Sequence, residues 1–328
     1  MKSLKSIIVL LAIALAMLGF AQTRKASPKV VMPQVTQKNI GLQLYSLRED
    51  INKSPGNIND IIAKVGQMGY KYVETANYSD GKFYGLTPED FKAKLAAAGM
   101  YALSSHTGYS LAQDVSKTKW NEVWAWWDQA IAAHKAAGMK YIVVASIPVP
   151  ETLEGLQAYC DYFNKIGEKC NAAGLKFGYH NHHQEFEKKY IDKSVLYDYA
   201  TSHSKKDFSD FMNKYDGIAM YDYMVTHTDR SKVFFEMDVY WAMMGHRSPV
   251  ELFKEYPGRF LVLHIKDEKE LGESGMVGFD AIFNNIQTAG AKYLIIEVER
   301  YDLPPIESVK ASLDYLNNAP FVKADYSK

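Results

Sequence analysis

Short apolar runs that end in polar side chains recur along the chain, and most follow a helical stretch closed by glycine. The repeated phrase is helix, glycine, strand, and the strand often begins with lysine and an aromatic residue. It occurs at 67–74, 97–106, 137–146, 172–180 and 288–297, with variants at 231–238 and 257–267. An opening apolar run lies at 40–44. Glycine just past a helix favours the left-handed conformation that returns the chain to a sheet.

This pattern predicts eight buried parallel strands, each followed by a helix. Near-continuous apolar runs are typical of strands that are covered on both faces. Strand–helix alternation repeated eight times predicts an α/β fold, a single-domain (β/α)8 TIM barrel over residues 39–322. A doubly wound open sheet is the alternative. It is weaker because no glycine-rich phosphate loop follows the first run, GLQLYSL.

One connection is longer than the others. Residues 188–217, which follow the fifth predicted strand, are polar and rich in tyrosine. In a barrel this connection emerges on the catalytic face, so the insertion could form a lid or a wall of the substrate site. A solvated surface excursion without a role is equally consistent with the composition.

The start of the chain predicts a targeting segment. Lys2 and Lys5 precede an uncharged apolar run at 7–20, and small residues follow at the cleavage position. We expect a secretory signal peptide over residues 1–21, because the run is short for a transmembrane span. A retained N-terminal anchor is the alternative. Residues 22–38 are expected to be a linker, and the mature protein is expected to be periplasmic, with no stable membrane span.

Charge and cysteine content narrow the function classes. The 38 basic residues equal the 38 acidic residues, so no basic surface for nucleic acid is indicated. Cys160 and Cys170 fall in one predicted helix, about 15 Å apart at the helical rise, which is too far for a disulfide. Stability is therefore expected to come from the core.

Polar side chains that can bind metal gather at the carboxyl ends of the predicted strands, where barrel active sites are built. They are Glu74 and His106 on strands 2 and 3, His180, His182 and Glu185 at strand 5, Glu236 and Asp238 on strand 6, His264, Lys266 and Asp267 on strand 7, and Glu297 and Glu299 on strand 8. Mixed imidazole and carboxylate ligands suit zinc, manganese, cobalt or iron. We therefore expect one divalent ion with open positions for substrate oxygens.

Each of these residues also has a structural explanation. His264 could be a core histidine, Asp238 could cap the next helix, and Glu297 could form a surface charge pair with Glu299 beside Arg300. It is less plausible that separate structural explanations hold at four equivalent strand ends than that the four residues form one shared site. The aromatic residues Tyr45, Tyr240 and Trp241 could stack on sugar C–H surfaces as substrate-binding residues, although ordinary packing would explain about half of such aromatics.

Several motifs resemble those of the xylose isomerase-like TIM-barrel superfamily, the sugar phosphate isomerase/epimerase group. In order they are GLQLYSLR (41–48), GYKYVET (69–75), SSH (104–106), GYHNH (178–182), FFEMDVYW (234–241), HIKD (264–267) and IIEVERY (295–301). The resemblance implies a divalent ion, commonly manganese, zinc or cobalt, held at strands 5 to 8. It carries over directly to Asp238, His264 and Glu297. His180 stands where the family usually has glutamate, so we predict His180 as the fourth ligand, with Glu185 as a nearby acid/base or substrate contact.

The resemblance also implies a reaction, namely proton removal next to a carbonyl through an enediolate. Glu297 with Glu185 or His182 is the expected acid–base pair. Lys266 and His106 could donate to a substrate oxygen, Lys266 could instead form a structural ion pair with Asp267 or Glu297, and Glu74 is a further catalytic candidate.

These observations predict a metal-dependent sugar isomerase or epimerase. Because phosphorylated sugars are cytosolic, an exported enzyme is expected to act on an unphosphorylated sugar, keto-sugar or glycoside. The YHNH tract also resembles the inosose dehydratase branch, so a keto-sugar lyase, dehydratase or hydratase is the alternative. A non-catalytic sugar-binding barrel is the third possibility. Apurinic endonucleases share the superfamily, but neutral charge and export do not fit them.

Overall fold

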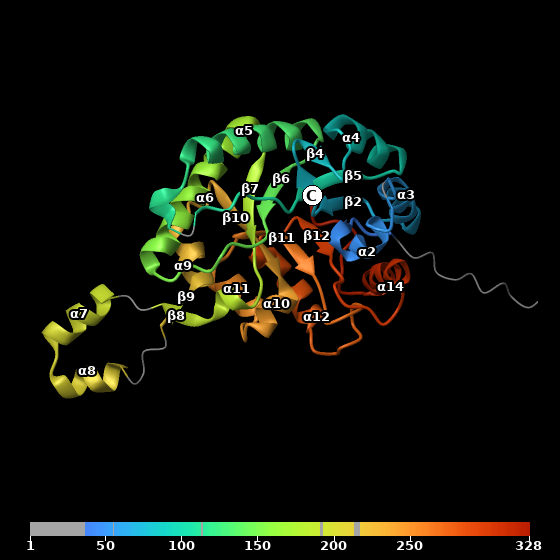
Figure 1. Ribbon diagram of the computed structural model, residues 1–328. Helices are drawn as coiled ribbons and strands as arrows, with labels where there is room; N and C mark the ends of the chain where they lie inside the picture. The colour runs from blue at the N-terminus through green and yellow to red at the C-terminus, as the bar shows by residue number, and fades with distance from the viewer. Residues whose placement is uncertain (1–36, 55, 113, 191–192, 213–216) are drawn as a thin grey trace, which may run out of the picture. The chain divides into compact units, whose positions relative to one another are not determined.

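Eight parallel strands form the central sheet, and their order in space follows their order along the chain (Figure 1). They are β1 (Gly41–Gln43), β2 (Tyr72–Thr75), β5 (Tyr101–Ser105), β6 (Tyr141–Val144), β7 (Lys176–His180), β10 (Val233–Asp238), β11 (Phe260–Ile265) and β12 (Tyr293–Ile296). The first strand pairs with the last. Backbone hydrogen bonds from Lys140 N to Leu103 O (2.9 Å) and from Thr107 N to Val143 O (2.9 Å) join β5 to β6. The predicted (β/α)8 barrel is confirmed.

The computed structural model describes residues 37–328 except 55, 113, 191–192 and 213–216. The predicted signal peptide and nearly all of the predicted linker lie outside the described residues. Within the described ranges, no helix is both long enough and apolar enough to cross a membrane. Near the start of the described chain, Asn39 N donates a hydrogen bond to Ala324 O (2.7 Å). The beginning and the end of the described chain therefore lie side by side.

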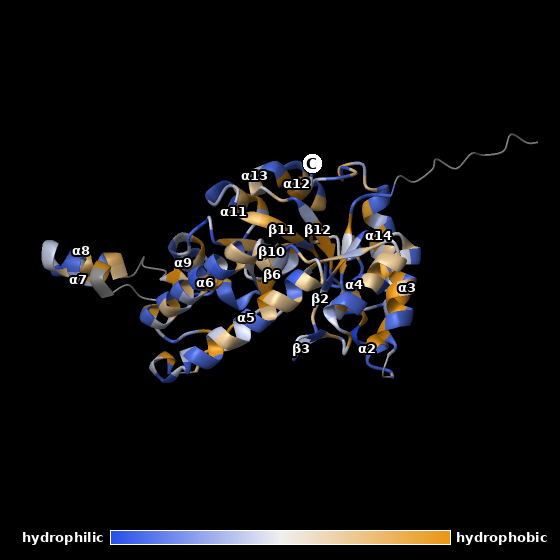
Figure 2. Ribbon diagram, turned by 90° about the horizontal axis from the view of Figure 1, so that it is seen from above, coloured by the Kyte–Doolittle hydropathy of each residue, from blue (hydrophilic) through white to orange (hydrophobic). Residues whose placement is uncertain are grey.

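Helices follow the strands and cover the outside of the barrel, and hydrophobic residues gather on the strands inside them (Figure 2). The helices of the described residues are η1 (Leu44–Leu47), α2 (Arg48–Ile51), α3 (Ile58–Met68), α4 (Pro88–Ala97), η2 (Val115–Lys117), α5 (Trp120–Ala136), α6 (Leu153–Ala173), η3 (Gln184–Phe186), α7 (Lys193–Ser202), α8 (Lys205–Met212), α9 (Met220–His227), α10 (Val239–Met244), α11 (Pro249–Glu255), α12 (Phe279–Asn284), α13 (Ile286–Ala289) and α14 (Pro305–Asn318). Of these, α7 and α8 belong to the insertion at 188–217.

The junctions between helix and strand follow the sequence pattern. Gly174, after α6, has a φ of 83°, and Gly290, after α13, has a φ of 80°. Both are in the left-handed region, which costs a glycine little. The two cysteines, Cys160 and Cys170, lie on α6 as predicted and are buried and free. These two turns between helix and strand follow the glycines of the sequence pattern.

Aromatic side chains fill the amino-terminal half of the barrel interior. The buried cluster consists of Tyr72, Leu103, Tyr141, Val143, Phe234, Val262, Tyr293 and Ile295. Two glycines make room for it, since a Cβ on Gly41 would lie 2.2 Å from the Tyr72 ring and one on Gly178 2.5 Å from the Phe234 ring. The barrel is therefore packed below, and its polar residues lie at the carboxyl ends of the strands.

Two short antiparallel strand pairs follow the carboxyl ends of β2 and β7. Strands β3 (Tyr78–Ser79) and β4 (Lys82–Phe83) follow β2 and were not predicted. The predicted insertion after the fifth strand is present. Its ends pair as β8 (Lys188–Tyr190) and β9 (Ile218–Ala219), and α7 and α8 lie between them. Whether the insertion has a role stays a prediction.

Candidate metal centre

Four side chains predicted to bind metal converge at one end of the barrel. The ligand atoms of His180, Asp238, His264 and Glu297 all lie within 4.8 Å of one another, and all four residues are buried. The parallel register explains this, because Asp238 on β10 lies opposite His264 on β11. Glu297 directly follows β12, and its Oε2 lies 3.4 Å from His264 Nδ1. We name these four residues the outer set.

The two carboxylate oxygens of Asp238 have different surroundings. Its Oδ1 accepts a hydrogen bond from Trp241 N (2.8 Å) and so caps α10. Its Oδ2 is buried without a hydrogen-bond partner among the described residues. Burial raises the pKa of Asp238 to about 7, against the opposing charge of Lys266. The capping explanation is thus correct, and it leaves one oxygen for a cation.

Lys266 follows β11 and places its ammonium among carboxylates. Its Nζ lies 2.5 Å from Glu299 Oε1, 3.2 Å from Glu297 Oε2 and 4.0 Å from Asp238 Oδ2. Burial lowers the pKa of Lys266, but Glu297 and Asp238 outweigh it, so the net shift is upward and the group is charged at neutral pH. Of the two ion pairs considered for Lys266, the one with Glu297 is present.

Asp267, the other partner considered, holds a loop instead. Its carboxylate accepts hydrogen bonds from Glu268 N (2.7 Å), Gly272 N (3.0 Å) and Ser274 Oγ. These contacts fix the segment that follows β11. Arg300 lies near Glu268 (3.8 Å), and Glu297 is buried. Glu297 is therefore not part of a surface charge pair beside Arg300.

Glu185 and His182 follow β7 and are linked to each other. Glu185 Oε1 accepts a hydrogen bond from Tyr179 OH (2.8 Å), and Oε2 accepts one from His182 N (3.1 Å). Both oxygens of Glu185 are therefore used inside the protein. The His182 ring lies 5.1 Å from the His180 ring, and its Nδ1 has no partner among the described residues. Burial lowers the pKa of His182 to about 4, so the imidazole is neutral at neutral pH.

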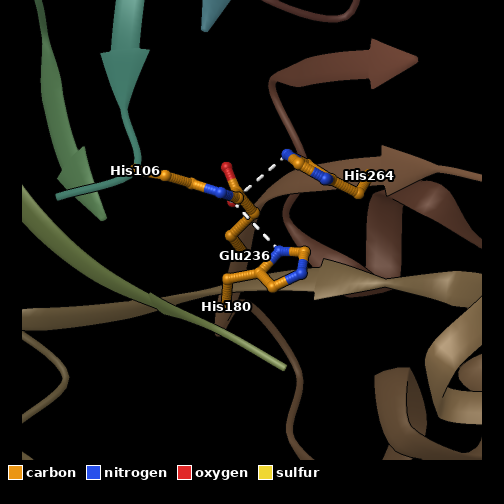
Figure 3. Close-up of side chains that lie close together, drawn as sticks. All are labelled: His106, His180, Glu236 and His264. Atoms are coloured by element: carbon orange, nitrogen blue, oxygen red, sulfur yellow. Dashed lines mark hydrogen bonds and ion pairs between the residues drawn. The ribbon is translucent and has the colours of Figure 1, made fainter. Parts of the chain in front are cut away.

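A second group of ligand-type side chains lies deeper in the barrel (Figure 3). Glu236 Oε2 lies 2.7 Å from His106 Nε2, 3.2 Å from His180 Nδ1 and 3.2 Å from His264 Nε2. We name His106, His180, Glu236 and His264 the inner set, which shares two histidines with the outer set. Glu236 was recognisable as a polar residue at a strand end, but no role was predicted for it.

Glu74 joins the inner set from β2. Its Oε1 accepts a hydrogen bond from Gln43 Nε2 (2.7 Å) and lies 2.8 Å from His264 Nε2 and 3.0 Å from His106 Nε2. Burial lowers the pKa of His106, but Glu74 and Glu236 outweigh it and raise the pKa to about 10. Gln43 was missed, although a polar residue at the carboxyl end of the opening strand is the same signal that identified Glu74.

The three predicted sugar-stacking residues lie in different surroundings. Trp241 lies beside the site, with Lys266 Nζ 4.9 Å from its ring centroid and the His182 ring 5.8 Å away. Tyr240 is buried in the hydrophobic core. Tyr45 is 43% exposed, and the Arg48 guanidinium lies 4.5 Å from its ring. The structure thus brings Trp241 to the site, and sugar contacts of all three residues stay predictions.

The family model described as xylose isomerase-like TIM barrel matches residues 62–319, most of the chain. The chain belongs to this family. A solved sugar phosphate isomerase/epimerase from Parabacteroides distasonis is 35% identical, with a TM-score of 0.73 over 87% of this chain and 100% of that one. No match was found among curated proteins.

Two more distant structures share the fold of this xylose isomerase-like barrel. An L-ribulose 3-epimerase is 13% identical, with a TM-score of 0.63 over 85% of this chain and 93% of that one. A probable 3-DHS dehydratase, AsbF from Bacillus anthracis, is 11% identical, with a TM-score of 0.60 over 85% and 99%. The likeness of the YHNH tract to inosose dehydratases stays a prediction.

Proposed function

We propose that this protein is a divalent-metal-dependent sugar isomerase or epimerase that acts through an enediolate on an unphosphorylated sugar or keto-sugar. The observation that carries the proposal is the convergence of the buried outer set at the carboxyl ends of adjacent strands. The 35% identical sugar phosphate isomerase/epimerase supports the reaction class. An unphosphorylated substrate rests on the predicted export.

The outer set suits a divalent ion. Two imidazoles and two carboxylates are the mixture that zinc, manganese and cobalt accept. Asp238 Oδ2 is a buried acceptor without a hydrogen-bond partner among the described residues, and buried polar atoms are usually hydrogen-bonded. When bound, the ion supplies positive charge next to the oxygens of an enediolate.

Glu297 and His182 are the proposed acid–base pair. A neutral imidazole can accept a proton from carbon and return it, and His182 is neutral at neutral pH because burial lowers its pKa. Glu185 acts as a positioning residue, since it accepts a hydrogen bond from the His182 backbone. Lys266 donates to a substrate oxygen, and the neighbouring Trp241 ring offers a face for sugar C–H groups.

A keto-sugar lyase or dehydratase is the second candidate, and the buried ammonium of Lys266 favours it. After the same proton removal, an ammonium group can donate a proton to a departing hydroxyl or glycosidic oxygen. Isomerisation and epimerisation return the proton to carbon instead. The two candidates therefore differ in product, and they share the residues that remove the first proton.

Proton exchange measured by NMR tests the proposal. The protein loaded with manganese, zinc or cobalt is incubated in D2O with free ketoses and 3-keto-glucosides. We expect deuterium at the carbon next to the carbonyl, together with an isomer or epimer, whereas an eliminated product would favour the second candidate. Glu297→Gln should slow the exchange by about 100-fold or more, because it removes a positioned base.

Two controls accompany this experiment. Treatment with EDTA should abolish exchange, and Glu299→Gln should retain more of it than Glu297→Gln, because Glu299 contacts Lys266 but is not in the outer set. Full exchange by Glu297→Gln would exclude Glu297 as the base. Full exchange after complete metal removal would exclude the metal-dependent mechanism.

A further inference from the structure

We propose that the barrel holds a second divalent ion in the inner set, formed by His106, His180, Glu236 and His264 (Figure 3). These residues come from the ends of β5, β7, β10 and β11, four different strands of the barrel. The site lies deeper than the outer set, and its existence does not depend on which reaction the outer set supports.

The inner donor atoms are already spaced like ligands of one ion. Three imidazole nitrogens surround a single oxygen, Glu236 Oε2, at 2.7, 3.2 and 3.2 Å. In a tetrahedral zinc site with bonds of about 2.0–2.1 Å, neighbouring ligand atoms lie about 3.3 Å apart. Small adjustments of these side chains would therefore admit the ion.

Hydrogen bonds alone leave Glu236 of the inner set and the neighbouring Glu74 unevenly satisfied. Glu236 Oε2 meets three ring nitrogens, while Oε1 is buried with no partner among the described residues. Glu74 repeats this arrangement, because its Oε1 faces Gln43, His106 and His264 and its Oε2 has no partner within the described chain. Glu236 therefore presents one oxygen, Oε2, to three nitrogens that can bind a metal.

Charge favours the same conclusion. Glu74 and Glu236 are both fully buried, and two buried carboxylates are costly unless positive charge lies beside them. One divalent ion supplies the two positive charges that neutralise them. Each imidazole binds metal through a nitrogen that carries no proton.

His180 and His264 belong to both sets, so binding both ions at once requires each of these two rings to release its remaining N–H proton to solvent and to bridge the ions as an imidazolate. His264 has a nitrogen facing each set. Its Nε2 lies 3.2 Å from Glu236 Oε2, and its Nδ1 lies 3.4 Å from Glu297 Oε2. Glu236 and Asp238 are two residues apart on β10, so they face the same side of the strand at successive depths. The inner ion has four protein ligands, an arrangement typical of structural metal sites. It would hold His180 and His264 in place beneath the outer ion.

Counting bound zinc tests the inference. The full chain is saturated with Zn²⁺, freed of excess by gel filtration and analysed for zinc per folded chain. We expect two ions in the wild type and one in Glu236→Gln, which lacks a carboxylate of the inner set only. The matched variant Asp238→Asn, which lacks a carboxylate of the outer set only, should also retain one ion. The double variant should retain none.

One zinc ion per wild-type chain, or a Glu236→Gln variant with the wild-type content, would overturn the inference. If Glu236→Gln does not fold, anomalous diffraction from zinc-soaked wild-type crystals decides instead: two peaks support the inner site and one peak refutes it. The result is separate from the proposed function. Two bound ions without proton exchange would refute only the proposed reaction. Proton exchange with a single bound ion would refute only the inner metal site.

Discussion

Lys266 combines two features that rarely occur together, a fixed positive charge and nearly complete burial. Its ammonium lies among Glu297, Glu299 and Asp238, under the ring of Trp241. Burial raises the pKa of Glu297, but the charge of Lys266 outweighs it and the net shift is downward. The ammonium therefore balances negative charge on two carboxylates of the outer set, Glu297 and Asp238.

Replacing Lys266 by methionine should make stability depend on metal. In EDTA, Lys266→Met should lower the free energy of unfolding by about 3–5 kcal/mol, because it leaves buried carboxylates without their partner. Added Zn²⁺ should restore most of this loss. Urea unfolding with and without metal measures both effects.

The matched control is Lys269→Met, which removes an exposed lysine that pairs with Asp302 on the surface. Surface ion pairs contribute little, so this variant should unfold like the wild type. If the two variants behaved alike in EDTA, the charge balance assigned to Lys266 would be wrong.

Among the helices, α5 carries a buried histidine on the face that packs against the β3–β4 hairpin. His134 is fully buried, and its Nδ1 lies 2.6 Å from Ala130 O. Its ring lies 4.9 Å from the rings of both Tyr78 and Phe83. Burial lowers the pKa of His134 to about 4. The helix is therefore docked through an imidazole that must stay neutral.

This histidine should make the fold sensitive to acid. The unfolded chain binds the proton below about pH 6.5 and the folded chain only below about pH 4, so the free energy of unfolding falls as the pH drops through that window. The loss should be about 2 kcal/mol between pH 7 and pH 5. Urea unfolding of wild type and His134→Gln, both in EDTA, measures it. An equal decline in the two proteins would show that His134 does not cause it.

The strands also show how far the sequence predicts the site. Asp238, His264 and Glu297 were recognisable because each ends an apolar run, and parallel strands end on one face. The partners of Glu236 could not be predicted, because they come from three other strands and depend on side-chain direction. Glu185 was predicted as a nearby acid/base or substrate contact, and this role stays a prediction. The sequence could not show that its oxygens accept hydrogen bonds from Tyr179 and the His182 backbone. The β3–β4 hairpin was missed because no apolar run marks strands of two residues.

At the scale of the whole barrel, the interior divides into an aromatic lower layer and a polar upper layer. The lower layer contains Tyr72, Phe234 and Tyr293, and the polar residues lie above it at the strand ends. Gly41 and Gly178 leave the space that two of these rings occupy. The lower layer therefore supports the strands that carry the outer and inner sets.

Filling that space should destabilise the barrel. A Cβ on Gly178 would lie 2.5 Å from the Phe234 ring, so Gly178→Ala should cost about 1–3 kcal/mol of unfolding free energy. Phe234→Leu in the same chain should recover part of the loss. Gly278→Ala is the control, because its Cβ would come no closer than 4.0 Å to the Ala281 Cβ. Thermal unfolding of the four proteins shows whether the clash is real.

The hydrogen bond from Asn39 to Ala324 has a consequence for engineering. Since the two ends of the described chain lie side by side, the packing of the barrel does not depend on where along it the chain begins. A short peptide could splice residue 328 to residue 37, and fresh termini could be opened between α7 and α8. Such a circular permutant would carry a fused reporter on the insertion and keep the present pairing of all eight strands.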